Sequence, residues 1–198
     1  MSQTWTSLLV DQLDFYLQAH LLPRLEGLTD DEYFWEPVPD CWSVRSDGAG
    51  GWTLDQGAPD DAERITTIAW RLVHVGVSNL GTRANAYFGP QAGDDVDMFD
   101  ARYVEPIPGT AADAVAQLTG AWTRWRDGIA ALDDDQLATP LGPKGGPYAA
   151  DPLAALVLHV SRETMHHGGE IGLLRDLYRD SVTAPRRGTS SSRAAPAS

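Results

Sequence analysis

The segment DPLAALVLHVSRETMHHGGEIGLLRDLYRD, residues 151–180, has the pattern of one long helix. Asp151 is a residue type that caps helices, and Pro152 suits the first helical position, where its missing N–H costs nothing. Apolar and small residues then recur at steps of three and four, which predicts a single face turned toward a core. The residues on this face are Leu153, Val157, Val160, Thr164, His167, Ile171, Leu174 and Tyr178.

This face includes a histidine, with a carboxylate beside it. At about 100° per residue, His167 lies near the middle of the apolar arc and Glu163 lies on its edge, one turn earlier. Both groups are costly to bury unless each finds a partner, and one bound cation would serve both. The alternative is that His167 is an ordinary core histidine held by a hydrogen bond. His159 and His166 make the same stretch rich in histidine.

Three other long segments have helical periodicity, and no segment alternates as a surface strand does. We expect these helices at residues 5–26, 62–88 and 110–132, with a short helix at 30–35. The loop at residues 38–61 either covers a pocket or is a surface excursion, because loops this long are uncommon without a role. The pattern predicts an all-α protein, a four-helix bundle with long connecting loops.

The length of 198 residues suits one domain. We place this domain at residues 1–182. Residues 183–198 are mostly Ser, Ala, Pro and Arg without apolar periodicity, so we expect a disordered tail there.

Composition limits the partners and the compartment. Fifteen Lys and Arg face 28 Asp and Glu, a formal charge of −13, which argues against nucleic acid and against an anionic membrane surface. The single cysteine, Cys41, excludes an internal disulfide and fits a reducing compartment. No segment resembles a signal peptide or a membrane span. We expect a cytoplasmic, unprocessed protein, and we leave a homodimer open.

His74 adds a second imidazole, at the margin of the apolar arc of the helix expected at 62–88. Together His74, Glu163 and His167 form a His₂Glu set, and three protein ligands with one open position are typical of catalytic zinc. Zinc is therefore the divalent metal we expect first, with nickel, iron or copper as alternatives that imidazole also suits. A di-iron bundle fits less well, because it needs Glu-x-x-His on two helices, and this chain has one Glu-x-x-x-His.

Three segments carry a family resemblance: IAWRLVHVG at residues 68–76, RANAYFGP at 83–90 and ETMHHGGEIGLLRDLY at 163–178. They are similar to the DinB-like superfamily, whose members are four-helix bundles with a metal site between helices. The resemblance implies metal ligands at His74, Glu163 and His167. The more common pattern has histidine where this chain has Glu163, and the Glu-x-x-x-His form resembles the mycothiol-dependent maleylpyruvate isomerase branch.

That resemblance implies a metal-activated thiol of low molecular weight, similar to mycothiol, used in S-transfer, conjugation or isomerisation. The isomerase has an additional C-terminal domain that is missing here, which counts against isomerase activity. Our leading hypothesis is a metal-dependent thiol S-transferase acting on a small molecule. The alternatives are a non-catalytic bundle that binds a metal or a ligand, and a metal-dependent hydrolase that activates water.

Three more residues have expected roles beside this centre. Arg83 could hold a carboxylate of the substrate or the thiol, or could instead form an ion pair at the surface or between helices. Glu170 and His166 could hydrogen-bond to the metal ligands, or could be ordinary surface residues.

Overall fold

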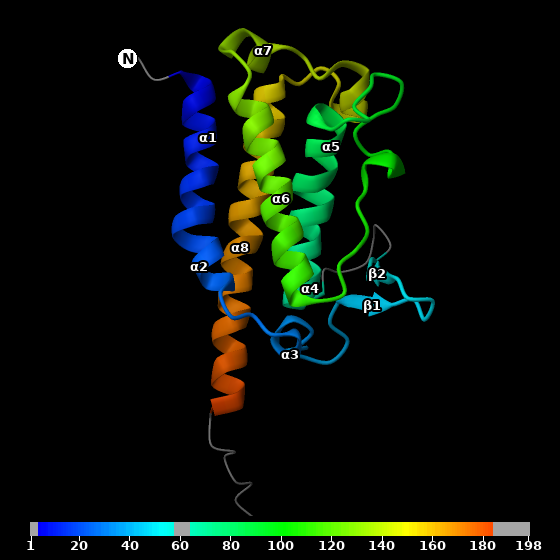
Figure 1. Cartoon of the computed structure of the whole chain (residues 1–198), viewed down its shortest axis with the longest axis vertical. Helices are drawn as coiled ribbons and strands as arrows, with labels where there is room; N and C mark the ends of the chain where they lie inside the picture. The colour runs from blue at the N-terminus through cyan, green and yellow to red at the C-terminus, as the bar shows by residue number, and fades with distance from the viewer. Residues whose placement is uncertain (1–3, 58–63, 184–198) are drawn as a thin grey trace, which may run out of the picture.

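Four long helical segments run side by side along the longest axis of the molecule (Figure 1). The computed structural model describes residues 4–57 and 64–183. Two of the four segments are interrupted by π-helical turns, labelled η1 and η2 here. The segments are α1 (Trp5–Tyr16) with η1 (Leu17–Leu21) and α2 (Leu22–Leu25); α4 (Ile68–Val73) with η2 (His74–Gly81) and α5 (Thr82–Phe88); α6 (Ala111–Ala130); and α8 (Leu153–Thr183). The prediction of an all-α four-helix bundle is confirmed.

Threonine caps begin three of these segments. The side chains of Thr4, Thr67 and Thr110 each accept a hydrogen bond from a backbone N–H in the first turn of α1, α4 and α6. Such a cap satisfies one of the N–H groups that a helix start leaves without a partner, and is worth about 1 kcal/mol.

The core lies between the four segments. Leu72, Leu80, Leu118 and Ile171 are fully buried within it, and burying one such side chain contributes about 1.5–3 kcal/mol. The helices η2 and α6 approach closely at Gly76, where a Cβ atom would lie 3.2 Å from the Cα of Leu118. This close approach accounts for a glycine inside a helix, where it costs about 1 kcal/mol.

The helix expected at 62–88 begins later than predicted, at Ile68. The backbone before it pairs with Trp42 instead: the N–H of Trp42 donates to the carbonyl of Ile65 at 3.0 Å, and the N–H of Thr67 donates to the carbonyl of Trp42 at 2.9 Å. Ile65 is consequently 54% exposed and lies before the helix.

The loop at 38–61 also contains two short strands that the sequence analysis did not predict. These are β1 (Val44–Ser46) and β2 (Trp52–Leu54), which form an antiparallel hairpin beside the lower end of α4 (Figure 1). Three residues per strand are too few for an alternating pattern to be recognised.

Short helices occupy the remaining connections. They are α3 (Asp30–Tyr33), the 3₁₀ turn η3 (Ala101–Tyr103), α7 (Asp134–Ala138) and the 3₁₀ turn η4 (Gly142–Tyr148). The helix α8 continues through Thr183, the first residue of the expected tail, and the rest of that tail lies outside the described residues. Among the described helices, none combines the length and the apolar character that crossing a membrane requires.

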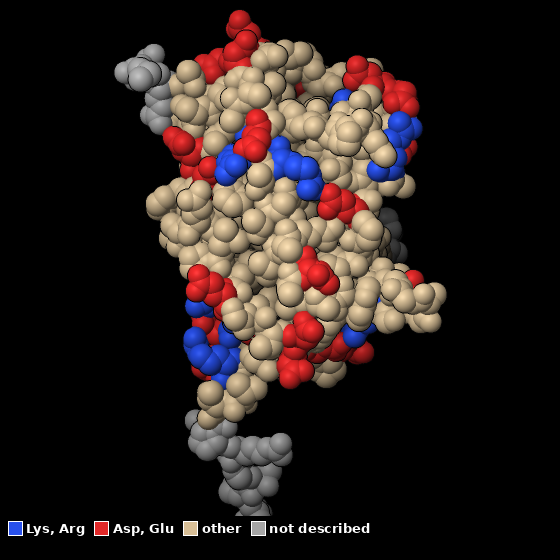
Figure 2. Space-filling view, viewed as in Figure 1, with Lys and Arg blue, Asp and Glu red and all other residues tan. Residues whose placement is uncertain are grey.

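Charges on the face drawn in Figure 2 are mixed. Basic side chains there lie next to acidic ones. This face therefore offers no continuous basic surface of the kind that nucleic-acid binding needs.

Candidate metal centre

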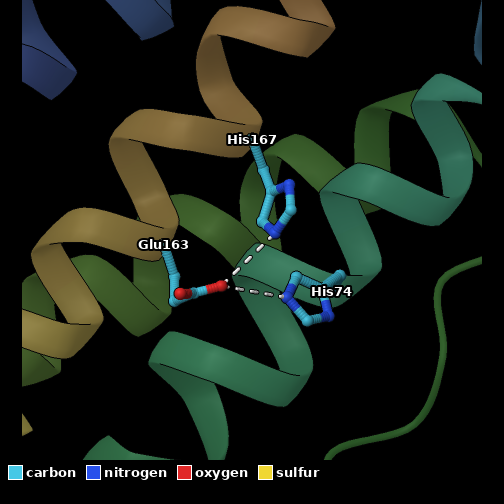
Figure 3. Close-up of side chains that lie close together, drawn as sticks. All are labelled: His74, Glu163 and His167. Atoms are coloured by element: carbon cyan, nitrogen blue, oxygen red, sulfur yellow. Dashed lines mark ion pairs between the residues drawn. The ribbon is translucent and has the colours of Figure 1, made fainter. Parts of the chain in front are cut away.

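Three side chains from two helices point toward one another where η2 faces α8 (Figure 3). His74 is the first residue of η2, and Glu163 and His167 lie one turn apart on α8. Glu163 Oε2 is 3.8 Å from His74 Nε2 and 3.4 Å from His167 Nε2. The three ligand atoms all lie within 4.8 Å of one another, so the set could hold a metal ion.

These distances fit a tetrahedral ion better than they fit hydrogen bonds. Zinc bonds to nitrogen and oxygen of about 2.0–2.1 Å place neighbouring ligand atoms about 3.3 Å apart. Hydrogen bonds between nitrogen and oxygen are shorter, about 2.7–3.2 Å. The donor set, two imidazoles and one carboxylate, is also one that zinc accepts.

The ring of His167 is held from its other nitrogen. Its Nδ1 is 2.6 Å from Glu170 Oε2, and because a carboxylate only accepts hydrogen bonds, Nδ1 carries the proton. The lone pair is then on Nε2, which faces Glu163. His167 is thus both a hydrogen-bonded core residue and a potential ligand, so the two readings of the sequence are compatible.

Arg71 supports this arrangement from α4, a role that the sequence analysis missed. Its Nε is 3.0 Å from Glu170 Oε2, so Arg71 holds the carboxylate that accepts from His167. Its guanidinium is also 3.0 Å from His167 Nδ1, but both groups are donors when Nδ1 carries the proton, so this contact is not a hydrogen bond. His166 lies 3.6 Å from Glu170 Oε1 and is largely exposed, so it reaches the supporting carboxylate and not the set of three. His166, His167 and Glu170 also bring three ligand atoms together, but the Arg71 cation beside them opposes a second metal ion there.

His74 is fixed by an aromatic stack. Its ring lies parallel to that of Trp70, with 5.0 Å between ring centroids, and Trp70 Nε1 donates a hydrogen bond to the carbonyl of Asp55 at 2.8 Å. Asp55 follows β2, so the hairpin loop supports the metal centre through Trp70. Burial, and after it the neighbouring His167, lowers the pKa of His74 to about 4, which keeps its imidazole neutral and able to ligate at neutral pH.

Each carboxylate oxygen of Glu163 has two basic side chains near it. Its Oε2 faces the two histidines of the set, and its Oε1 is 3.8 Å from His159 Nδ1 and 3.6 Å from Arg162 Nε. Burial raises the pKa of Glu163, but the surrounding imidazoles and the guanidinium outweigh burial and lower it overall. The carboxylate is therefore ionised at neutral pH, as a metal ligand must be.

A buried amide, which the sequence analysis also missed, joins the two helices of the centre. Asn79 Nδ2 donates to the carbonyl of Val160 at 3.1 Å and contacts Thr164 Oγ1 at 3.4 Å. This bridge sets how η2 lies against α8, and therefore how His74 meets Glu163. The available signal was an amide between apolar neighbours on the face turned to the core, where a buried polar group needs a partner.

Arg83 lies at the start of α5, in the wall of a cavity of about 370 Å³. One guanidinium nitrogen donates to the carbonyl of Ser78 at 2.5 Å, and the group lies 5.0 Å from the centre of the Phe99 ring. Within residues 4–57 and 64–183, no carboxylate pairs with Arg83, so the expected alternative of an ion pair is not what the structure has.

A family model described as the DinB superfamily matches residues 16–171, a segment that includes all three candidate ligands. The chain belongs to the DinB superfamily. The resemblance inferred from the sequence is thereby confirmed. No curated protein matches this DinB-superfamily chain, and no solved structure matches it either.

Proposed function

We propose that this DinB-superfamily protein is a metal-dependent enzyme of the thiol S-transferase type. His74, Glu163 and His167 would hold a divalent cation, zinc first and nickel or iron as alternatives. The observation that carries the proposal is the convergence of the three ligand atoms within 4.8 Å from two helices. Three protein ligands leave one position of a tetrahedral ion for an exchangeable ligand, which is the mark of a catalytic site.

A divalent cation with an open position lowers the pKa of a thiol bound there, or of water, so that the nucleophilic anion forms near neutral pH. Glu163 would offset one of the two charges of the cation. Glu170 and Arg71 would keep His167 oriented, and Trp70 would hold the plane of His74.

The cosubstrate in this proposal is a low-molecular-weight thiol similar to mycothiol, and Arg83 binds a carboxylate of the second substrate. Such thiols are kept reduced in the cytoplasm, which is where we propose that the enzyme works.

Metal analysis with elemental identification is the first test, followed by cobalt substitution. We expect near-stoichiometric metal in the purified protein and a cobalt spectrum that changes when a small thiol is added. Bound metal without any response to thiols would instead indicate a structural or ligand-binding role. Turnover that needs the metal but no thiol would indicate a hydrolase.

A further inference from the structure

The cavity beside Arg83 adjoins the candidate metal centre without including its histidines. His159 and Arg162 line it, and both face Glu163 Oε1, whereas Glu163 Oε2 faces His74. Glu163 thus contacts residues of the cavity wall through one oxygen and the metal centre through the other. At about 370 Å³ the cavity is within the range of small-molecule sites, about 300–1,000 Å³.

The guanidinium of Arg83 lines this cavity, and no carboxylate of the described residues forms an ion pair with it. Arg83 is partly buried, its Nε is buried and has no hydrogen-bond partner among the described residues, and none of their carboxylates pairs with it. Arg162 is already engaged, by Glu163 at 3.6 Å and by His159 Nδ1 at 2.8 Å. Asp151 also lines the cavity but is exposed and forms an ion pair with neither arginine.

This unneutralised cation is unexpected in a chain with almost twice as many acids as bases, 28 against 15. A guanidinium that is partly removed from water and lacks an acid gains most from an anionic ligand, and its planar fork matches a carboxylate. One such cation balances a singly charged carboxylate and leaves a doubly charged phosphate short of partners.

The remaining walls are apolar and aromatic. Met98, Leu141 and Leu156 are buried at the cavity, while the rings of Phe99 and Tyr148 are 45% and 53% exposed. Large exposed aromatic side chains beside a hollow offer contact area to the flat apolar body of a ligand.

We infer that this cavity binds a small carboxylic acid with an aromatic or apolar body, its carboxylate on Arg83 and its body against Phe99 and Tyr148. This inference rests on the proposed function in one respect: it makes the acid the second substrate of the thiol transferase. Binding of the acid itself depends on Arg83 and not on the metal.

Calorimetric titration of the full chain with phenylacetate and with the neutral phenylacetamide tests the inference. We expect the amide to bind at least about tenfold more weakly than the acid, as for the loss of a charged hydrogen bond. Arg83→Met should lower the affinity for the acid by the same factor and leave the affinity for the amide unchanged. Arg179→Gln removes one positive charge from the exposed end of α8 and is the matched control, with no effect expected.

Repeating the titration on His167→Ala separates the cavity from the metal centre. Retained binding of the acid supports the inference, even if the variant and the wild type both lack a thiol response and the proposed function fails. Equal affinity for the acid and the amide overturns the inference. It is also overturned if the acid still binds to Arg83→Met but no longer binds to His167→Ala, because the acid then binds the metal. If Arg83→Met does not fold, Tyr148→Ala replaces it, and an unchanged affinity for both probes counts against the site.

Discussion

Two carboxylates at α8 have very different partners: Glu163 lies on this helix, and Glu32 reaches it from α3. Glu32 meets Arg175 in a fork, with Nε to Oε1 at 2.7 Å and the second nitrogen to Oε2 at 2.9 Å. Glu163, twelve residues earlier on α8 than Arg175, has the two imidazoles of the candidate metal centre at 3.4 and 3.8 Å, beyond ordinary hydrogen-bond length.

The comparison separates a structural ion pair from a site prepared for a ligand. The carboxylate of Glu32 is buried and its two oxygens are satisfied by the protein, so it ties α3 to α8. The carboxylate of Glu163 faces imidazoles that stand apart by roughly the spacing that an ion between them would require. The predictions below test this contrast, in order of decreasing effect.

Arg175→Met should be the most destabilising change. It leaves the buried Glu32 carboxylate without its partner, which costs about 3–5 kcal/mol of the free energy of unfolding. Denaturant unfolding followed by circular dichroism measures this loss, and metal content per folded protein should stay unchanged. A variant as stable as the wild type would show that the fork contributes nothing and remove the contrast.

His167→Ala should lower metal affinity by more than about 100-fold, because losing a ligand costs more than losing an outer contact, which costs about 10–100-fold. Competition with a chelator dye reports the affinity, and circular dichroism should show that the bundle still forms. His166→Ala is the matched control, since this neighbouring histidine is exposed and outside the set. Full metal retention in His167→Ala would falsify the proposed centre.

Glu170→Gln should weaken metal binding by about tenfold, less than loss of a ligand. The amide still contacts His167 Nδ1 but no longer offers a charged acceptor, so the ring is held less firmly. The same dye competition measures the change. An affinity equal to wild type would mean that His167 needs no support from this side.

Thr29→Ala should have the smallest effect, about 1 kcal/mol of unfolding free energy, from loss of the cap of the short helix that carries Glu32. Thr29→Ser keeps the oxygen and should restore most of the stability. Metal affinity should be the same in both variants, and a change in it would mean that the two carboxylates are coupled.

Much of the fold could be predicted from the sequence because the signals are local. A cap such as Thr110 and apolar residues at helical spacing mark where helices run. The start of α4 was misplaced because pairing of the preceding residues with Trp42, a distant partner, prevails over a continuing apolar pattern.

In the candidate centre, too, some contacts could be predicted from local sequence and others could not. Glu163 and His167 share a face at a spacing of four, so their proximity follows from the geometry of one helix. The fork of Glu32 with Arg175 joins residues 143 positions apart, and no local pattern announces it. Arg71 carries no periodic signal of its role either, because a cation in a helix is most often a surface residue.

The sequence by itself determined where the helices lie, that α8 presents a histidine and a carboxylate on one face, and that this face is otherwise apolar. Tertiary structure alone decided that His74 meets that pair, that Arg83 lines a cavity with no ion-pair partner among the described residues, and that Glu32 is paired with Arg175. The physical reason is that backbone hydrogen bonds and helical periodicity act over a few residues, whereas the meeting of side chains depends on which helices pack together and at what rotation.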